Sequence, residues 1–155
     1  MVYTSSLQYI TLPMFENRTR PHLLRRILAG VVDYILIYII TLFLIFTLGE
    51  QNSDGEYALN GILALVPILF WFLMTVGIET SLGYTLGNGV AGIKPIPLTG
   101  ESRKLTLGES LKRHLLDPID MSFFGIVGII TINSTEKNQR LGDLWGKTIV
   151  VKQDK

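Results

Sequence analysis

Two long apolar runs constrain the fold of this chain more than any other feature of its sequence. The first covers residues 27–48 and contains one charged residue, Asp33, and the second covers residues 58–78 and contains none. A helix rises about 1.5 Å per residue, so each run is long enough to cross a hydrocarbon core about 30 Å thick. Neither run has the polar stripe of an amphipathic surface helix. They therefore predict two transmembrane helices in an all-α integral membrane fold.

A third apolar stretch, over residues 121–132, is too short to span a membrane alone. Extending it back to residue 115 makes it long enough, but the extension contains Asp117, Pro118 and Asp120. One alternative is a spanning helix with acids near one end. The other is a broken or re-entrant element, whose irregular backbone must be covered by protein or water. We favour a third membrane helix over about residues 115–132 that is broken near Pro118.

The few charged residues indicate the orientation of the chain. They make up 17% of its 155 residues, below the roughly 25% of soluble domains. Four arginines precede the first apolar run and five Lys or Arg residues lie between residues 80 and 114, whereas the linker over residues 50–57 has three acids and no base. The positive-inside rule therefore predicts a cytoplasmic N-terminus and an external linker. The basic tail favours a cytoplasmic C-terminus, which a re-entrant third element would explain.

Composition excludes several classes of function. The chain has no cysteine, which rules out a disulfide scaffold, a thiol nucleophile and a Cys-ligated metal site. A net charge of +1 argues against nucleic-acid binding, which needs a basic surplus on one face. No Ser/His/Asp constellation is recognisable, and His22 and His114 are isolated beside basic residues. We therefore predict no enzymatic activity, no cofactor and no metal site. The arginines follow residues 1–17, so we expect the first helix to act as an uncleaved signal anchor.

The segment between the second and third apolar stretches predicts a small cytoplasmic cap. Residues 92–98 alternate as an edge strand would, and the β-branched residues 148–152 are its natural partner. Thr106 and Glu109 have the spacing of a capping box, which starts a helix that runs to about Leu116. Residues 87–92 match G-x-G-x-x-G but follow a membrane helix instead of a strand, so we expect a tight glycine turn and no dinucleotide site. We find no internal repeat.

Ionisable residues at membrane depth are costly, and they are the candidate functional residues. Asp33 lies seven residues after Arg26 on the same helix face, and the small residues between them allow another helix to approach. The candidates to accompany Asp33 are charged residues near the ends of the other apolar stretches: Glu79, Arg113, Asp117, Asp120 and Arg140. Two interpretations stay open. These residues form an ion-pair network that holds three helices together, or they form a proton or cation relay along a wet cavity.

Ordered motifs cover residues 25–151. They begin with Arg25-Arg26-x-x-Ala29-x-x-x-Asp33 and continue with Glu79, Thr85-Leu86-Gly87-x-x-x-x-Gly92-Ile93, Leu111-x-Arg113 and Asp120. They end with Gln139-Arg140-Leu141-Gly142-Asp143-Leu144 and Thr148-Ile149-Val150-Val151. Together they resemble the RDD family of small bacterial membrane proteins, whose eponymous arginine and two aspartates map to Arg26, Asp33 and Asp143. Asn88 departs from the family, which usually has lysine there, and Trp145-Gly146-Lys147 replaces the usual small residues.

The resemblance implies a compact helical domain in the bacterial cytoplasmic membrane, over residues 25–151, between a cytoplasmic segment (1–24) and a tail (152–155). Transport is commonly suggested for the family, and cation/proton exchange has been proposed for some members. By this resemblance the chain is a small, oligomeric secondary transporter. Asp33 and Asp120 would carry the coupling ion, Na⁺, H⁺ or another cation, while Arg26 and Asp143 form a cytoplasmic gate or brace. The alternative is a non-transporting accessory subunit that binds the lipid bilayer and other membrane-protein subunits.

Overall fold

A computed structural model describes residues 22–153 of the chain, apart from the side chain of Phe124. Most of the expected N-terminal segment, and the last two residues of the tail, lie outside this range. In chain order the elements are α2 (Leu23–Leu48), β1 (Glu50–Gln51), β2 (Tyr57–Ala58), η1 (Gly61–Leu65), α3 (Val66–Phe72), η2 (Leu73–Gly77), α4 (Ile78–Leu82), α5 (Leu86–Ala91), β3 (Ile93–Pro97), α6 (Leu107–Leu115), α7 (Asp117–Asp120), α8 (Ser122–Ser134), α9 (Leu141–Gly146) and β4 (Thr148–Lys152).

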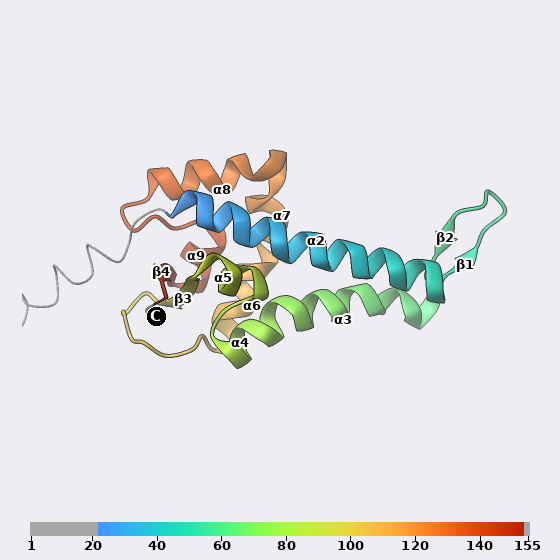
Figure 1. Cartoon of the computed structure of the whole chain (residues 1–155), viewed down its shortest axis with the longest axis horizontal. Coiled ribbons are helices and arrows are strands. Elements are labelled where there is room, and N and C mark those ends of the chain that lie inside the picture. The colour runs from blue at the N-terminus through green and yellow to red at the C-terminus, as the bar shows by residue number, and fades with distance from the viewer. Residues whose placement is uncertain (1–21, 154–155) are drawn as a thin grey trace, which may run out of the picture.

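Two long helices form an arm that extends from one side of the molecule (Figure 1). One is α2, and the other is the continuous helix Gly61–Leu82, which joins η1, α3, η2 and α4. Both are long and apolar enough to cross a membrane, as the apolar runs predict. The second helix begins at Gly61 instead of residue 58, because Ala58 belongs to strand β2 and the left-handed backbone of Gly61 (φ +58°) separates strand from helix.

The acidic linker forms a short β-hairpin at the far end of this arm (Figure 1), which the sequence pattern does not predict. Strands β1 and β2 pair antiparallel, with Glu50 opposite Ala58. The side-chain oxygen of Asn52 closes the turn by accepting from the backbone N–H groups of Asp54 (3.0 Å) and Glu56 (2.8 Å). Strands of two residues are too short to leave a periodic signal in the sequence.

The second long helix changes its winding before it leaves the arm. Residues Leu73–Gly77 form a π-helical turn, whose Thr75 and Val76 are buried, and Glu79 follows with no exposed surface. π-turns are rare and frequently mark functional sites. This turn packs against α6, so Glu79 faces the compact part of the molecule.

The third apolar stretch is a bent pair of helices, as expected, but the bend follows Asp120 instead of lying at Pro118. The helical path is interrupted at Leu116, Pro118 lies in the first turn of α7, and the axis bends by 115° between Asp120 and Gly125. The direction changes here because Gly125 has a left-handed backbone (φ +83°). Residues 22–153 thus contain two helices long enough to span a membrane, or three such segments if this bent pair acts as one.

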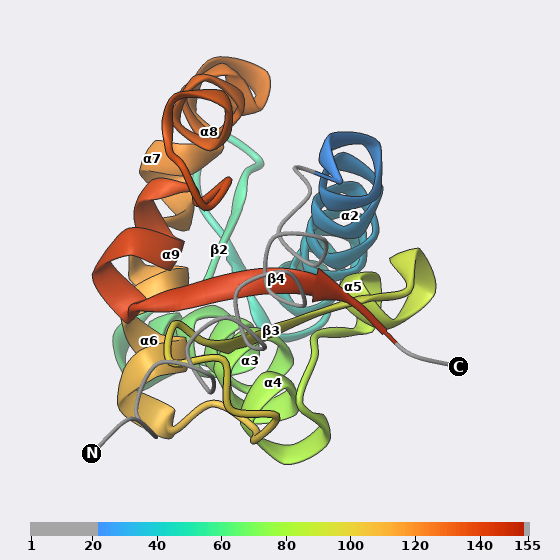
Figure 2. The same cartoon turned by 90° about the vertical axis from the view of Figure 1, so that its left-hand side faces the viewer.

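The remaining elements pack into a compact end beside the arm. Strands β3 and β4 pair antiparallel from Ile93↔Lys152 to Pro97↔Thr148, which confirms the expected two-stranded sheet. Figure 2 shows this sheet lying across the molecule, between α9 on one side and α5 on the other. The capping box that starts α6 is also present, with both hydrogen bonds between Thr106 and Glu109.

The glycine-rich segment differs from the expected tight turn. Residues Leu86–Ala91 form the short helix α5, and Gly92 (φ +66°) ends it with a left-handed residue. A helix precedes this segment and a strand follows it, which is the reverse of the order in a dinucleotide-binding motif.

Candidate functional site

An arginine of α2 is paired with an aspartate of α9. Arg26 Nη1 lies 2.8 Å from Asp143 Oδ2, and Arg26 Nη2 donates to the carbonyl of Asn138 at 2.9 Å. On the other oxygen of the same carboxylate, Arg113 Nη1 lies 2.5 Å from Asp143 Oδ1. The backbone N–H of Arg140 donates to Asp143 Oδ2 at 3.2 Å. The fully buried Asp143 therefore links α2, α6 and α9.

The surrounding charges keep Asp143 and Arg140 ionised. Burial alone would raise the pKa of Asp143, but the nearby guanidiniums outweigh burial and hold the pKa well below its usual range. Burial alone would lower the pKa of Arg140, but three aspartate carboxylates raise that pKa above its ordinary value. The ion pairs of α9 are therefore present at neutral pH.

Glu79 is buried against α6. Its Oε2 accepts from the hydroxyl of Ser110 at 2.6 Å and lies 3.4 Å from both Arg113 Nε and His114 Nε2. Its Oε1 has no hydrogen-bond partner among the described residues. One buried carboxylate oxygen is thus left available as an acceptor.

Asp117, at the start of α7, is contacted from three directions. His114 Nδ1 lies 2.7 Å from its Oδ2, and the hydroxyl of Tyr34 donates to the same oxygen at 2.8 Å. Arg140 Nη1 lies 2.8 Å from the other oxygen. The imidazole of His114 therefore lies between two carboxylates, those of Asp117 and Glu79, while Tyr34 connects Asp117 to α2.

These side chains form one buried group, which we call the charge network: Arg26, Glu79, Arg113, His114, Asp117, Asp120, Arg140 and Asp143. It contains three guanidiniums and four carboxylates. With every carboxylate ionised and the imidazole neutral, the network has one more negative than positive charge. One proton, on His114 or on a carboxylate, makes the network neutral, and buried charge without compensation is costly.

Asp33 and Asp120, of which only Asp120 belongs to the charge network, hold the N-termini of short helices. Asp33 Oδ1 accepts from the N–H of Gly87 and its Oδ2 accepts from the hydroxyl of Thr85, both at 2.6 Å. Asp120 accepts from the N–H groups of Leu141 (3.0 Å) and Gly142 (2.9 Å). Asp33 is thus bound to α5 and Asp120 to α9, which satisfies N–H groups that a helix leaves unpaired.

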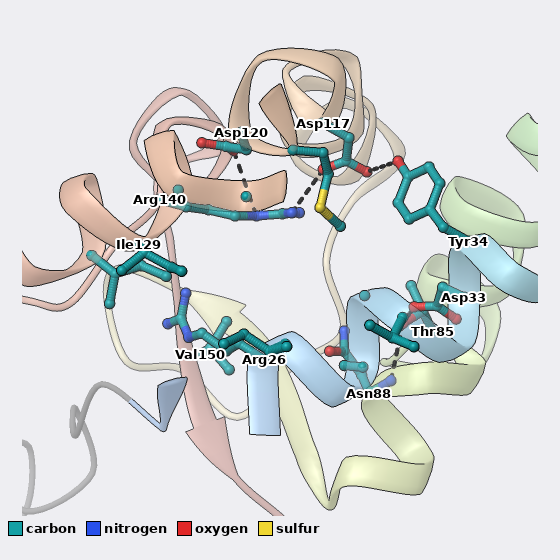
Figure 3. Close-up of a pocket in the computed structure, with 18 of the residues that line it drawn as sticks. Arg26, Asp33, Tyr34, Thr85, Asn88, Asp117, Asp120, Ile129, Arg140 and Val150 are labelled. Atoms are coloured by element: carbon teal, nitrogen blue, oxygen red, sulfur yellow. Dashed lines mark hydrogen bonds and ion pairs between the residues drawn. The ribbon is translucent and has the colours of Figure 1, made fainter. Parts of the chain in front are cut away.

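A cavity of about 170 Å³ lies between α2 and the α7–α8 pair. Figure 3 shows Asp117, Asp120 and Arg140 on one side of it and Asp33, Thr85 and Asn88 on the other, with Tyr34 between the two groups. Apolar side chains complete the wall, including Ile129 and Val150. The cavity thus places titratable groups of several elements around one space.

The structure brings together most, but not all, of the residues expected from the sequence. Seven of them lie in the charge network: Arg26, Glu79, Arg113, Asp117, Asp120, Arg140 and Asp143. Asp33 lines the same cavity, but it hydrogen-bonds to Thr85 and Gly87 instead of to any of the expected charged partners. The sequence does not predict Thr85 and Gly87 as its partners, because the glycine-rich segment 86–91 does not have the pattern of a helix.

Sequence reasoning missed three polar residues of the site: Tyr34, Thr85 and His114. The expectation that His114 is isolated is wrong, because it contacts Asp117 one helical turn further on and Glu79 of another helix. The spacing of His114 and Asp117 is a signal that indicates such a pair. Among the described residues, no three His, Cys, Asp or Glu side chains are arranged to hold a metal ion.

The geometry defines a mostly helical domain with two long apolar helices, small strands and a buried charge network, consistent with a membrane protein. The sequence profile of the RDD family matches residues 20–147, and the chain belongs to this family. The resemblance of its motifs is thereby confirmed. No curated protein and no solved structure matches the chain.

Proposed function

We propose that this chain is a small secondary transporter of the bacterial cytoplasmic membrane that exchanges protons for a cation such as Na⁺. One observation carries the proposal: His114 lies between Asp117 and Glu79 beside the cavity, in a network that becomes neutral when it takes up one proton. Histidine is the side chain whose ordinary pKa lies closest to neutral pH. A proton that enters or leaves here changes the charge that a cation in the cavity experiences.

Polar groups connect the cavity to this histidine. Tyr34 and Asp117 both line the cavity and are hydrogen-bonded to each other, and Asp117 contacts His114. The other ring nitrogen of His114, Nε2, lies 3.4 Å from Glu79 Oε2. Ionisable groups that face a cavity within membrane helices are typical of proton and ion pathways.

The charge distribution supports one orientation in the membrane. The acidic hairpin β1–β2 lies at one end of the arm, and the basic connection around β3 and α6 lies at the other (Figure 1). By the positive-inside rule, the compact end and the N-terminus face the cytoplasm. The chain has no cysteine, so Lys155→Cys gives a single labelling site. Labelling of that site only from outside the cell would overturn this orientation.

The transport proposal is tested with the full chain in liposomes that contain a pH-sensitive dye. With an imposed pH gradient, we expect addition of Na⁺, Li⁺ or K⁺ outside to drive proton movement. His114→Gln should abolish it, whereas Lys112→Gln, which neutralises an exposed side chain on the same helix, should retain it. Absence of cation-dependent proton movement with the unaltered protein would reject transport. Equal movement in His114→Gln would reject the role of His114.

A second candidate function is that of a non-transporting accessory subunit. The contacts of three carboxylates favour it. Both oxygens of Asp33, Asp117 and Asp120 contact donors of the chain itself. Such an arrangement suits a rigid brace. If the protein purifies with a stoichiometric membrane partner and shows no flux in liposomes, this function replaces the first.

A further inference from the structure

The compact end contains two copies of one structural unit. The first unit, residues 85–97, comprises α5, the left-handed Gly92 (φ +66°) and β3. The second unit, residues 140–152, comprises α9, the left-handed Lys147 (φ +53°) and β4. Each has a helix of six residues and a strand of five residues, and each helix begins with Leu-Gly followed by Asn or Asp. The two units therefore match in the order and length of their elements.

The pairing of the strands relates the units by a pseudo-two-fold axis. Pro95 occupies the same place in β3 as Val150 does in β4, and these two residues are paired with each other. Exchanging the units converts the pair Ile93↔Lys152 into the pair Thr148↔Pro97, which is also present. The register is therefore symmetric, and the sheet lies on the axis.

Both units are attached to the rest of the molecule in the same way. The glycine at the second helical position donates its N–H to an aspartate, from Gly87 to Asp33 at 2.6 Å and from Gly142 to Asp120 at 2.9 Å. Each glycine also lies directly on a backbone carbonyl of another helix, Gly87 on that of Ala29 and Gly142 on that of Arg113. The shared attachment shows that the likeness of the units extends to their surroundings.

The units differ at the third helical position. In the second unit this is Asp143, which is fully buried and paired with Arg26 and Arg113. In the first unit it is Asn88, which is half-buried and lines the cavity. An amide carries no charge, so the first unit has no counterpart of these ion pairs. Among the described residues, three side chains from outside hydrogen-bond to this unit: Asp33, the exposed Arg25, whose Nη1 donates to the carbonyl of Ala91 at 2.6 Å, and Gln153, whose Nε2 donates to the carbonyl of Ile93 at 2.9 Å.

We propose that the first unit is the movable wall of the cavity and that Asp33 holds it closed, while the second unit is its fixed counterpart. When Asp33 releases Thr85 and Gly87, α5 moves away from α2 and the cavity opens beside Asn88. The role of this movement rests on the proposed transport function, because the movement opens the same cavity. The movement itself is measured without any flux.

The test is hydrogen exchange of the full chain in lipid nanodiscs, followed by mass spectrometry of the segments 86–91 and 141–146. Amide exchange reports local opening. In the unaltered protein we expect segment 86–91 to exchange about tenfold faster than segment 141–146. Thr85→Val removes a hydroxyl that donates to Asp33 and also caps α5 by accepting from the N–H of Asn88, whereas Asp33→Asn keeps this cap. Both variants should accelerate exchange of segment 86–91 several-fold and leave segment 141–146 unchanged.

Thr80→Val is the matched control, because the hydroxyl of Thr80 donates only within its own helix and its loss should alter neither segment. Equal exchange of the two segments in the unaltered protein would overturn the proposal, and so would a Thr85→Val or Asp33→Asn variant with unchanged exchange of segment 86–91. Faster exchange of segment 86–91 in a protein without flux would reject transport and retain the movable first unit.

Discussion

The first and second units follow the same backbone path and both line the cavity, yet only the second lies among arginines. Their helices start with the same Leu-Gly pair and end with a left-handed residue. The second unit continues into the charge network through Asp143. The first has the uncharged Asn88 at that position and is bound to α2 through Asp33 and Arg25. Local sequence therefore determines the shape of the units, and long-range charge determines how firmly each is held.

Asp143 and Asp33, the carboxylates that contact the two units, have different kinds of partner and therefore different roles. Asp143 is surrounded by fixed cations that belong to other helices, so it stabilises the assembly of α2, α6 and α9. Asp33 has only neutral donors, a hydroxyl and a backbone N–H. A carboxylate held by neutral donors exchanges them for a proton or cation more readily than one held by guanidiniums, because charge-assisted hydrogen bonds are stronger.

The largest effect is expected when the charge that distinguishes the second unit is removed. Asp143→Asn leaves Arg26 and Arg113 buried without their shared carboxylate, and breaking a buried ion pair costs about 3–5 kcal/mol. Unfolding in detergent micelles measures this loss. Glu101→Gln, which neutralises an exposed carboxylate, serves as the control and should leave stability unchanged. A loss below about 1 kcal/mol for Asp143→Asn would show that the network contributes little.

A second comparison concerns the glycines that both units share. In Gly87→Ala and Gly142→Ala the added methyl group overlaps a backbone carbonyl oxygen, that of Ala29 or Arg113, which moves only with its whole helix. We expect each variant to lose about 2–3 kcal/mol of stability, as overpacked cores do. Gly108→Ala is the control, because a methyl group there meets no atom within 4 Å and alanine favours the helix. Similar losses in both units would support their equivalence, and a harmless Gly87→Ala would contradict it.

Sequence reasoning succeeds where the signal is local. The two long helices follow from continuous apolar runs, the capping box of α6 from the spacing of Thr106 and Glu109, and the strand pair from β-branched residues. It also identifies most of the charge network, since charged residues beside apolar runs have few alternatives to pairing.

Sequence reasoning fails where structure depends on contacts between distant segments. α5 consists largely of glycine and small residues, which disfavour helices in isolation, and it forms because Asp33 and Thr85 hold its N-terminus. The repeat is hidden because the two units share little more than the Leu-Gly pair, while the likeness lies in backbone geometry and attachment. Only the backbone geometry shows that Asn88 and Asp143 occupy equivalent positions in the two units and can be compared.

The pH dependence of stability tests the charge of Asp143, the residue that distinguishes the second unit from the first. The pKa of Asp143 is lower in the folded protein than in the unfolded chain, where a carboxyl of this type titrates near about 3.9. Asp143 therefore contributes stability above the pKa of the unfolded chain, and this contribution is lost as pH falls toward the folded pKa. Unfolding measured from pH 6 down to pH 3 should show a smaller decline in Asp143→Asn than in the unaltered protein. An identical decline would contradict the low pKa.

The smallest effects are expected from the two aspartates that hold the helix N-termini. Asp33→Asn and Asp120→Asn each replace one acceptor oxygen by a donor, so each should cost about 1–2 kcal/mol through one unpaired donor. Their local consequences should differ, because ion pairs of Asp143 still hold α9 after Asp120 is altered, whereas α5 has no such support. Hydrogen exchange should therefore rise in segment 86–91 of Asp33→Asn and change little in segment 141–146 of Asp120→Asn. Equal rises in both segments would show that the arginines around Asp143 do not hold the second unit, and the two units would then be equally mobile.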